Sequence, residues 1–153
     1  DDGGERFHNS ALLFGPDGAL AAVYRKQRLF AFAGEHERYP AGDAGVVVWV
    51  GGVRLAPFIC FDLRFPELFR AVAPRVDALV LLANWPASRR MHWDVLVRAR
   101  AVENQCYVVA VNRTGVAAAW STTEAPRRTT RGAIPWRRRR TAASCSRAST
   151  PPR

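Results

Sequence analysis

The sequence of 153 residues is short of three features, and each shortage excludes a class of protein. Its apolar runs all fall below the roughly 18 residues that a membrane-spanning helix needs. Its three cysteines are too few for a small disulfide-stabilised scaffold. Its beginning, DDGGERFHNS, lacks the basic and apolar segments of a secretory signal peptide. These observations favour a globular domain, and with its free thiols we expect a cytoplasmic location.

Lysine is almost absent: Lys26 is the only lysine, and the other basic residues are arginines. The formal net charge of +10 suggests nucleic-acid binding, but the excess lies mostly after Gly115. Residues 116–153 have no apolar periodicity and are rich in Arg, Ser, Thr, Ala and Pro. We therefore expect two parts, a folded domain over 1–115 and a basic, disordered tail over 116–153. A nucleic-acid-binding arm and an out-of-frame translation are the alternatives for the tail.

Apolar patterning over residues 1–115 predicts strands alternating with helices. The predicted strands are 10–14, 20–24, 46–50, 53–59, 77–83 and 107–111, and the predicted helices are 66–72 and 91–104. Turn residues at 15–18 and 51–52 predict two hairpins. The segments 77–83 and 107–111 are nearly all apolar, which is typical of strands buried on both faces. The pattern predicts an α/β fold.

Cys60 is the main candidate for chemistry, because it ends a predicted strand just before a tight turn into a helix. A nucleophile on such a turn is held exposed, near backbone N–H groups that can bind an oxyanion. The alternative is a buried structural cysteine, the role we expect for Cys106. Lys26 also follows a strand and could stabilise an oxyanion, although most lysines only face solvent. The spacing of Cys and His matches no zinc site.

Three further positions are candidate pocket residues. Asn84 and Trp85 follow a predicted buried strand, where a pocket wall would lie. His92 is at the start of a predicted helix, where it would cap the helix or line a pocket. Glu35 lies in a polar loop that would ordinarily be solvated.

Five stretches occur in an order that resembles the nitrilase (carbon–nitrogen hydrolase) superfamily, and within it the omega-amidase-like bacterial enzymes. They are YRKQRLF (24–30), AGEHERYPAGD (33–43), ICFDLRFPELFR (59–70), ANWPASRRMHW (83–93) and RARAVENQCYVVAVNRTG (98–115). The resemblance implies an α-β-β-α sandwich and hydrolysis of a small ω-amide, with release of ammonia and a cysteine thioester intermediate. It implies no metal or organic cofactor, and it suggests a homodimer.

The resemblance also assigns roles to individual residues. Cys60 matches the family's nucleophile, Lys26 its catalytic lysine, and Glu35 a second glutamate that supports the lysine. The backbone N–H of Phe61 would join Lys26 around the oxyanion. We expect Phe61, Asn84, Trp85 and His92 to contact the substrate.

Two departures from the family pattern limit this expectation. The only glutamate before Lys26 is Glu5, whose surroundings do not match those of the family's general base. Residues 116–153 lack the Gly-Asp-Ser stretch that follows in the family. The chain thus resembles the central part of a partial sandwich, and we expect little turnover from it. The alternatives are a non-catalytic fragment or pseudoenzyme and a nucleic-acid binder that uses the basic tail.

Overall fold

The computed structural model describes residues 7–117 and 120–122. Its strands are β1 (Ser10–Phe14), β2 (Leu20–Arg25), β3 (Val48–Val50), β4 (Val53–Ile59), β5 (Ala78–Ala83), β6 (Tyr107–Asn112), β7 (Gly115–Ala117) and β8 (Trp120–Thr122). Its α-helices are α1 (Glu35–Arg38), α2 (Pro66–Val72) and α3 (Arg90–Asn104). Short 3₁₀ helices cover Ala31–Ala33, Cys60–Arg64, Ala73–Arg75 and Ala87–Arg89. The predicted order of strands and helices is confirmed.

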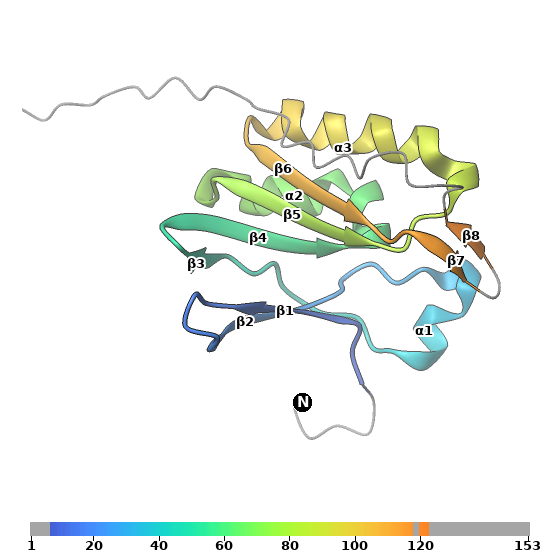
Figure 1. Cartoon of the computed structure of the whole chain (residues 1–153), viewed down its shortest axis with the longest axis horizontal. Coiled ribbons are helices and arrows are strands. Elements are labelled where there is room, and N and C mark those ends of the chain that lie inside the picture. The colour runs from blue at the N-terminus through green and yellow to red at the C-terminus, as the bar shows by residue number, and fades with distance from the viewer. Residues whose placement is uncertain (1–6, 118–119, 123–153) are drawn as a thin grey trace, which may run out of the picture.

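A four-stranded sheet in the order β3-β4-β5-β6 forms the centre of the molecule (Figure 1). β3 and β4 form the predicted antiparallel hairpin across Gly51 and Gly52, whereas β4, β5 and β6 run parallel. The carboxyl ends of these three strands therefore lie at the same edge of the sheet. Ligands of open α/β sheets bind at that edge, and Cys60 and Asn84 both lie there.

The layers are those of a partial α-β-β-α sandwich. Helices α2 and α3 cover one face of the sheet, and the antiparallel β1–β2 hairpin lies on the other side, below β3 and β4 (Figure 1). Proline in the first turn of α2 suits a helix start, because that position needs no N–H. The core between sheet and helices contains Phe58 stacked on Phe69, with ring centroids 4.0 Å apart. Tyr24 extends this core from the β1–β2 hairpin.

The two faces of the sheet differ in burial, which corrects one prediction. Leu79, Leu81 and Val108 are fully buried, but several residues that alternate with them on β5 and β6 are 40–46% exposed: Leu82, Tyr107, Val109 and Val111. On the same face of β5, Ala78 is buried and Val80 is half-buried. The prediction of burial on both faces is therefore wrong for 107–111 and for the carboxyl end of 77–83. The β1–β2 hairpin lies over β3 and β4, and the described residues place no second layer over β5 and β6 (Figure 1).

Smaller differences concern the ends of the elements. β3 begins at Val48 instead of residue 46, although Val46 and Val47 still pack against the core. β5 begins at Ala78 instead of residue 77, and the side chain of Asp77 binds the backbone N–H and guanidinium of Arg54. β7 and β8 pair across the predicted boundary at Gly115. The rest of the predicted tail lies outside the described residues, so the division at residue 115 stays a prediction.

None of the described helices combines the length and the apolar composition needed to cross a membrane.

Candidate active site

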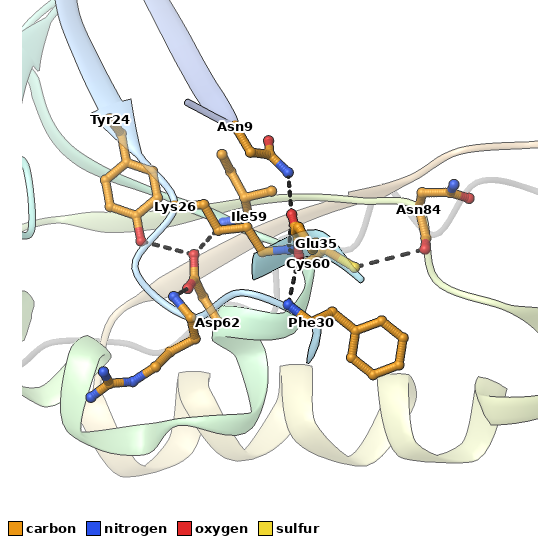
Figure 2. A network of polar contacts seen from close by, with 10 residues as sticks. Asn9, Tyr24, Lys26, Phe30, Glu35, Ile59, Cys60, Asp62 and Asn84 are labelled. Atoms are coloured by element: carbon orange, nitrogen blue, oxygen red, sulfur yellow. Dashed lines mark hydrogen bonds and ion pairs between the residues drawn. The ribbon is translucent and has the colours of Figure 1, made fainter. Parts of the chain in front are cut away.

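Cys60 lies on a sharp turn at the end of β4. Its φ of 46° is in the left-handed region, which a residue with a side chain rarely adopts, and the 3₁₀ helix Cys60–Arg64 starts there. The turn directs the thiol away from the strand, and the S–H lies 3.7 Å from the carbonyl oxygen of Asn84, which accepts a hydrogen bond (Figure 2). The predicted strand-to-helix turn at this cysteine is confirmed. Backbone strain of this kind is frequent at functional residues.

Lys26 and Glu35 form a buried ion pair beside this turn. The Lys26 ammonium donates to both carboxylate oxygens of Glu35, at 2.8 and 2.6 Å. Only 3% of the Lys26 side chain is exposed. Glu35 also accepts hydrogen bonds from the Asn9 side chain and the Phe30 backbone N–H, both at 2.6 Å (Figure 2). Burial opposes ionisation of Glu35, but the hydrogen bonds outweigh it and hold the pKa of this carboxyl below its usual value.

The backbone around Lys26 is fixed as firmly as its side chain. Its N–H donates to the carbonyl of Asn9, and its carbonyl accepts from Gly42 N–H, both at 2.8 Å. Gly42 approaches the backbone of Arg25 so closely that a Cβ at this position would clash with it. A glycine is therefore required where residues 33–43 pass the end of β2.

Asp62 joins the lysine loop to the cysteine turn. It is fully buried, and its carboxylate accepts hydrogen bonds from the Tyr24 hydroxyl at 2.8 Å and from the backbone N–H groups of Arg28 and Ile59 at 2.9 Å each (Figure 2). Burial raises the pKa of Asp62, and these hydrogen bonds only partly offset the effect. Ile59 precedes the cysteine and Arg28 follows the lysine by two residues. The carboxylate thus fixes the two segments relative to each other.

The electrostatics at Cys60 combine opposing effects. Burial raises the pKa of the thiol, while the positive charge of Lys26 and the hydrogen bond to Asn84 lower it. The carboxylates of Glu35 and Asp62 raise it further, so the net shift is upward. In the described state the thiol is mostly protonated near neutral pH. Forming the reactive thiolate therefore requires a proton acceptor or a ligand that favours the anion.

A pocket of about 150 Å³ opens at Cys60. Its lining consists of Cys60, three aromatic residues, two arginines and three smaller contributors: Phe30, Ala33, Phe61, Arg64, Asn84, Trp85, Pro86 and Arg89. Asn112 fixes the pocket wall, because its side chain accepts from Trp85 N–H at 2.7 Å and donates to the Trp85 carbonyl at 2.9 Å. The Trp85 indole N–H donates to the carbonyl of Arg89 at 2.9 Å.

The structure brings together most residues singled out in the sequence. The Lys26–Glu35 pair lies near Cys60 (Figure 2), and Cys60 lines the pocket together with Phe61, Asn84 and Trp85. His92 does not line the pocket; its Nδ1 accepts a hydrogen bond at 3.1 Å from Arg64, which does. The buried position of Cys106 confirms its structural role. Glu5 lies outside the described residues.

Sequence reasoning missed five residues that shape this site: Asn9, Asp62, Arg64, Arg89 and Asn112. Asp62 and Arg64 lie in the stretch CFDLRF next to the nucleophile, and Asn112 directly follows a predicted strand, as Asn84 does. Their positions at strand ends were the available signal. In the described part of the chain, His, Cys, Asp and Glu form no group of three or more that could hold a metal ion.

Comparison with known proteins agrees, over most of the chain, with the family resemblance found in the sequence. Residues 2–133 match the Carbon-nitrogen hydrolase family. The chain is 46% identical over 107 residues to omega-amidase YafV of Escherichia coli (strain K12), and 45% identical over 114 residues to 2-oxoglutaramate amidase of Paenarthrobacter nicotinovorans. The matches cover 70% and 71% of this chain but only 41% and 39% of those proteins.

A solved structure agrees with the sequence matches. XC1258 from Xanthomonas campestris, a CN-hydrolase superfamily protein with an arsenic adduct in its active site, superimposes with a TM-score of 0.70 at 42% identity. The match covers 76% of this chain and 46% of XC1258. With the family match over residues 2–133, these similarities show that the chain belongs to the carbon–nitrogen hydrolase family.

Proposed function

We propose that this chain carries the nucleophile region of an amidase, in which Cys60 attacks the carbonyl carbon of a small amide. The observation that supports the proposal most strongly is the Lys26–Glu35 ion pair close to Cys60, which itself lines a mainly apolar pocket. A buried ammonium next to a strained cysteine suits a reaction in which negative charge develops on the substrate oxygen.

The reaction proceeds through a thioester. The Cys60 sulfur forms a bond to the amide carbon, the carbon–nitrogen bond breaks, and the thiol proton leaves with the nitrogen as ammonia. Water then attacks the thioester, which releases the carboxylic acid and restores the thiol. Lys26 and the backbone N–H of Phe61 stabilise the oxyanion in both steps, and Glu35 holds Lys26 in place.

The described residues include no carboxylate available to accept the proton of the Cys60 thiol. The two carboxylates that act on Cys60 are Glu35 and Asp62. Glu35 accepts from Lys26, Asn9 and Phe30, and Asp62 accepts from three donors of its own. Neither is available to take the thiol proton. We therefore expect slow acylation and slow turnover from the chain.

We propose small ω-amides of keto or dicarboxylic acids as the substrate class. The support is similarity to an omega-amidase and a 2-oxoglutaramate amidase, together with a pocket of a size that admits a few carbon atoms beyond the carbonyl. The homodimer that the family suggests and the cytoplasmic location expected from the sequence stay predictions.

The test is to incubate the chain with 2-oxoglutaramate and to measure both released ammonia and the intact protein mass. The proposal predicts ammonia above the uncatalysed rate and a thioester mass on the chain. Both signals are lost in Cys60→Ser. The matched control Cys106→Ser keeps both, because Cys106 packs in the core away from the pocket. If the wild type shows neither signal, and its Cys60 reacts with alkylating reagents no differently from free cysteine, the alternative of a non-catalytic fragment is correct.

A further inference from the structure

Two arginines, Arg64 and Arg89, line the pocket, whereas Lys26 and Glu35 do not. Arg64 ends the 3₁₀ helix that starts at Cys60, and Arg89 lies in the turn before α3. Both line the pocket together with Cys60. Neither residue belongs to the proposed chemistry, so their presence in a mainly apolar pocket calls for another explanation.

Aromatic rings hold both guanidinium groups in place. The Arg64 guanidinium carbon lies 5.0 Å from the centre of the Trp85 ring, and that of Arg89 lies 5.5 Å from the centre of the Phe30 ring. A ring face orients a guanidinium without using up its N–H donors. One N–H of Arg64 donates a hydrogen bond to His92 Nδ1. Most donors of the two groups therefore remain available to a ligand.

The charges of the pocket arginines are also uncompensated in the described part of the chain. Other arginines near by have carboxylate partners: Arg28 pairs with Glu67, Arg90 with Asp94 and Arg100 with Glu103. The charge of Lys26 is matched by Glu35. Within residues 7–117, neither Arg64 nor Arg89 forms an ion pair with a carboxylate. The pocket thus has an excess of positive charge next to the nucleophile.

We propose that Arg64 and Arg89 are specificity-determining residues that bind the carboxylate of an anionic amide while Cys60 attacks its amide carbon. The inference rests on the proposed amidase function and adds the residues that select its substrate. A guanidinium fork matches the two oxygens of a carboxylate, and an apolar pocket wall strengthens the attraction. Neutral amides of the same size would bind without this contribution.

The test compares two alkylating reagents of nearly equal size, anionic iodoacetate and neutral iodoacetamide, and needs no turnover. The measured quantity is the ratio of their rate constants at Cys60, followed on the tryptic peptide that contains it. This peptide is 55–64 where Arg64 is present and 55–70 in the variants without Arg64, and neither contains another cysteine. The variants are Arg64→Gln, Arg89→Gln and both together. Arg98→Gln is the matched control, because Arg98 is an exposed arginine on α3.

We expect the iodoacetate-to-iodoacetamide ratio to fall by about two- to fivefold for each pocket arginine removed, and not to change in Arg98→Gln. Lys26 attracts iodoacetate in all variants alike, so the differences report the arginines. A ratio that is the same in wild type and Arg89→Gln overturns the inference. Arg89→Gln decides even if Arg64→Gln does not fold, because the Arg89 guanidinium contacts only a ring face.

The same experiment separates this inference from the proposed function. A chain that shows the predicted change in ratio but releases no ammonia from 2-oxoglutaramate supports the anion subsite and contradicts hydrolysis by this chain. A chain that releases ammonia equally well from 2-oxoglutaramate and from a neutral amide of similar length contradicts the anion subsite alone.

Discussion

The charged residues around Cys60 form two groups, a paired side and a recognition side, which differ in whether the protein itself satisfies their charges. On one side, Lys26, Glu35 and Asp62 are buried, and every charge has a partner within the protein. On the other side, Arg64 and Arg89 rest on aromatic rings without carboxylate partners in the described chain. A charged group whose hydrogen bonds are all made within the protein fixes the positions of its neighbours. A charged group with unused donors can bind a ligand. The comparison assigns positioning to the first side and recognition to the second.

The largest expected effect is on the paired side. Glu35→Gln leaves the Lys26 ammonium buried without a counter-charge, so we expect the free energy of unfolding to fall by roughly 3–5 kcal/mol. Urea unfolding at neutral pH measures this change. Glu67→Gln is the matched control: its ion pair with Arg28 is exposed on both sides, and we expect a loss below about 1 kcal/mol. Equal losses in the two variants would contradict the role assigned to the buried pair.

The lowered pKa of Glu35 gives the same prediction a pH dependence. Because the folded pKa lies below the ordinary value of 4.5, the ionised carboxylate stabilises the fold above that value. This stabilisation is lost as the pH falls through the lowered pKa. The stability difference between wild type and Glu35→Gln should therefore shrink on acidification.

A second, smaller effect is expected at Asp62. Asparagine has one carbonyl oxygen and one NH₂ group, so in either orientation the NH₂ faces a backbone N–H, that of Arg28 or that of Ile59. We expect the free energy of unfolding to fall by about 1–3 kcal/mol. Asp17→Asn, which alters an exposed hydrogen bond to Ala19 N–H, is the control and should change it little. If Asp62→Asn is as stable as the control, Asp62 does not fasten the two segments.

The sequence was sufficient for what depends on local pattern. Periodicity located the strands and helices, and the strand-end position of Cys60 pointed to the site. The roles of Asp62 and Arg64 depend on contacts with residues 28–38 positions away, Tyr24, Arg28 and His92, which no local pattern contains. Asp62 also precedes a helix, where an acidic residue is common for another reason, the helix dipole.

The burial of the sheet also depends on distant parts of the chain, which a local sequence pattern does not contain. An apolar run such as 77–83 indicates a strand, but whether both faces are covered depends on where a separate layer of the chain lies. Leu79 and Leu82 are equally apolar in the sequence, yet one is fully buried and the other is 41% exposed. The two residues face opposite sides of the sheet. Helices α2 and α3 cover the side of Leu79, whereas the β1–β2 hairpin on the other side lies over β3 and β4 and leaves Leu82 uncovered (Figure 1).

A third prediction concerns the thiol between the two sides. Because the pKa of Cys60 is raised above the ordinary value of 9.0, the rate of alkylation by iodoacetamide should reach half its maximum above that pH. Lys26→Gln removes the charge that lowers this pKa, so the midpoint should move further upward and labelling at neutral pH should slow. Arg38→Gln, an exposed cation on α1, is the control and should leave the profile unchanged. A downward shift in Lys26→Gln would contradict the proposed environment of the thiol.

The smallest expected effect on stability is that of Arg89→Gln, on the recognition side. It tests most directly whether the two groups of charged residues have different roles. The Arg89 guanidinium lies over the Phe30 ring and pairs with no described carboxylate, so Arg89→Gln should change the free energy of unfolding by no more than about 0.5 kcal/mol. Urea unfolding provides this number, and it should be close to that of Arg98→Gln. If Arg89 contributes little to stability but changes the reactivity of Cys60 toward anions, its role is to bind a ligand and not to stabilise the fold. A loss as large as that in Asp62→Asn would instead place Arg89 among the positioning residues and remove the distinction between the two sides.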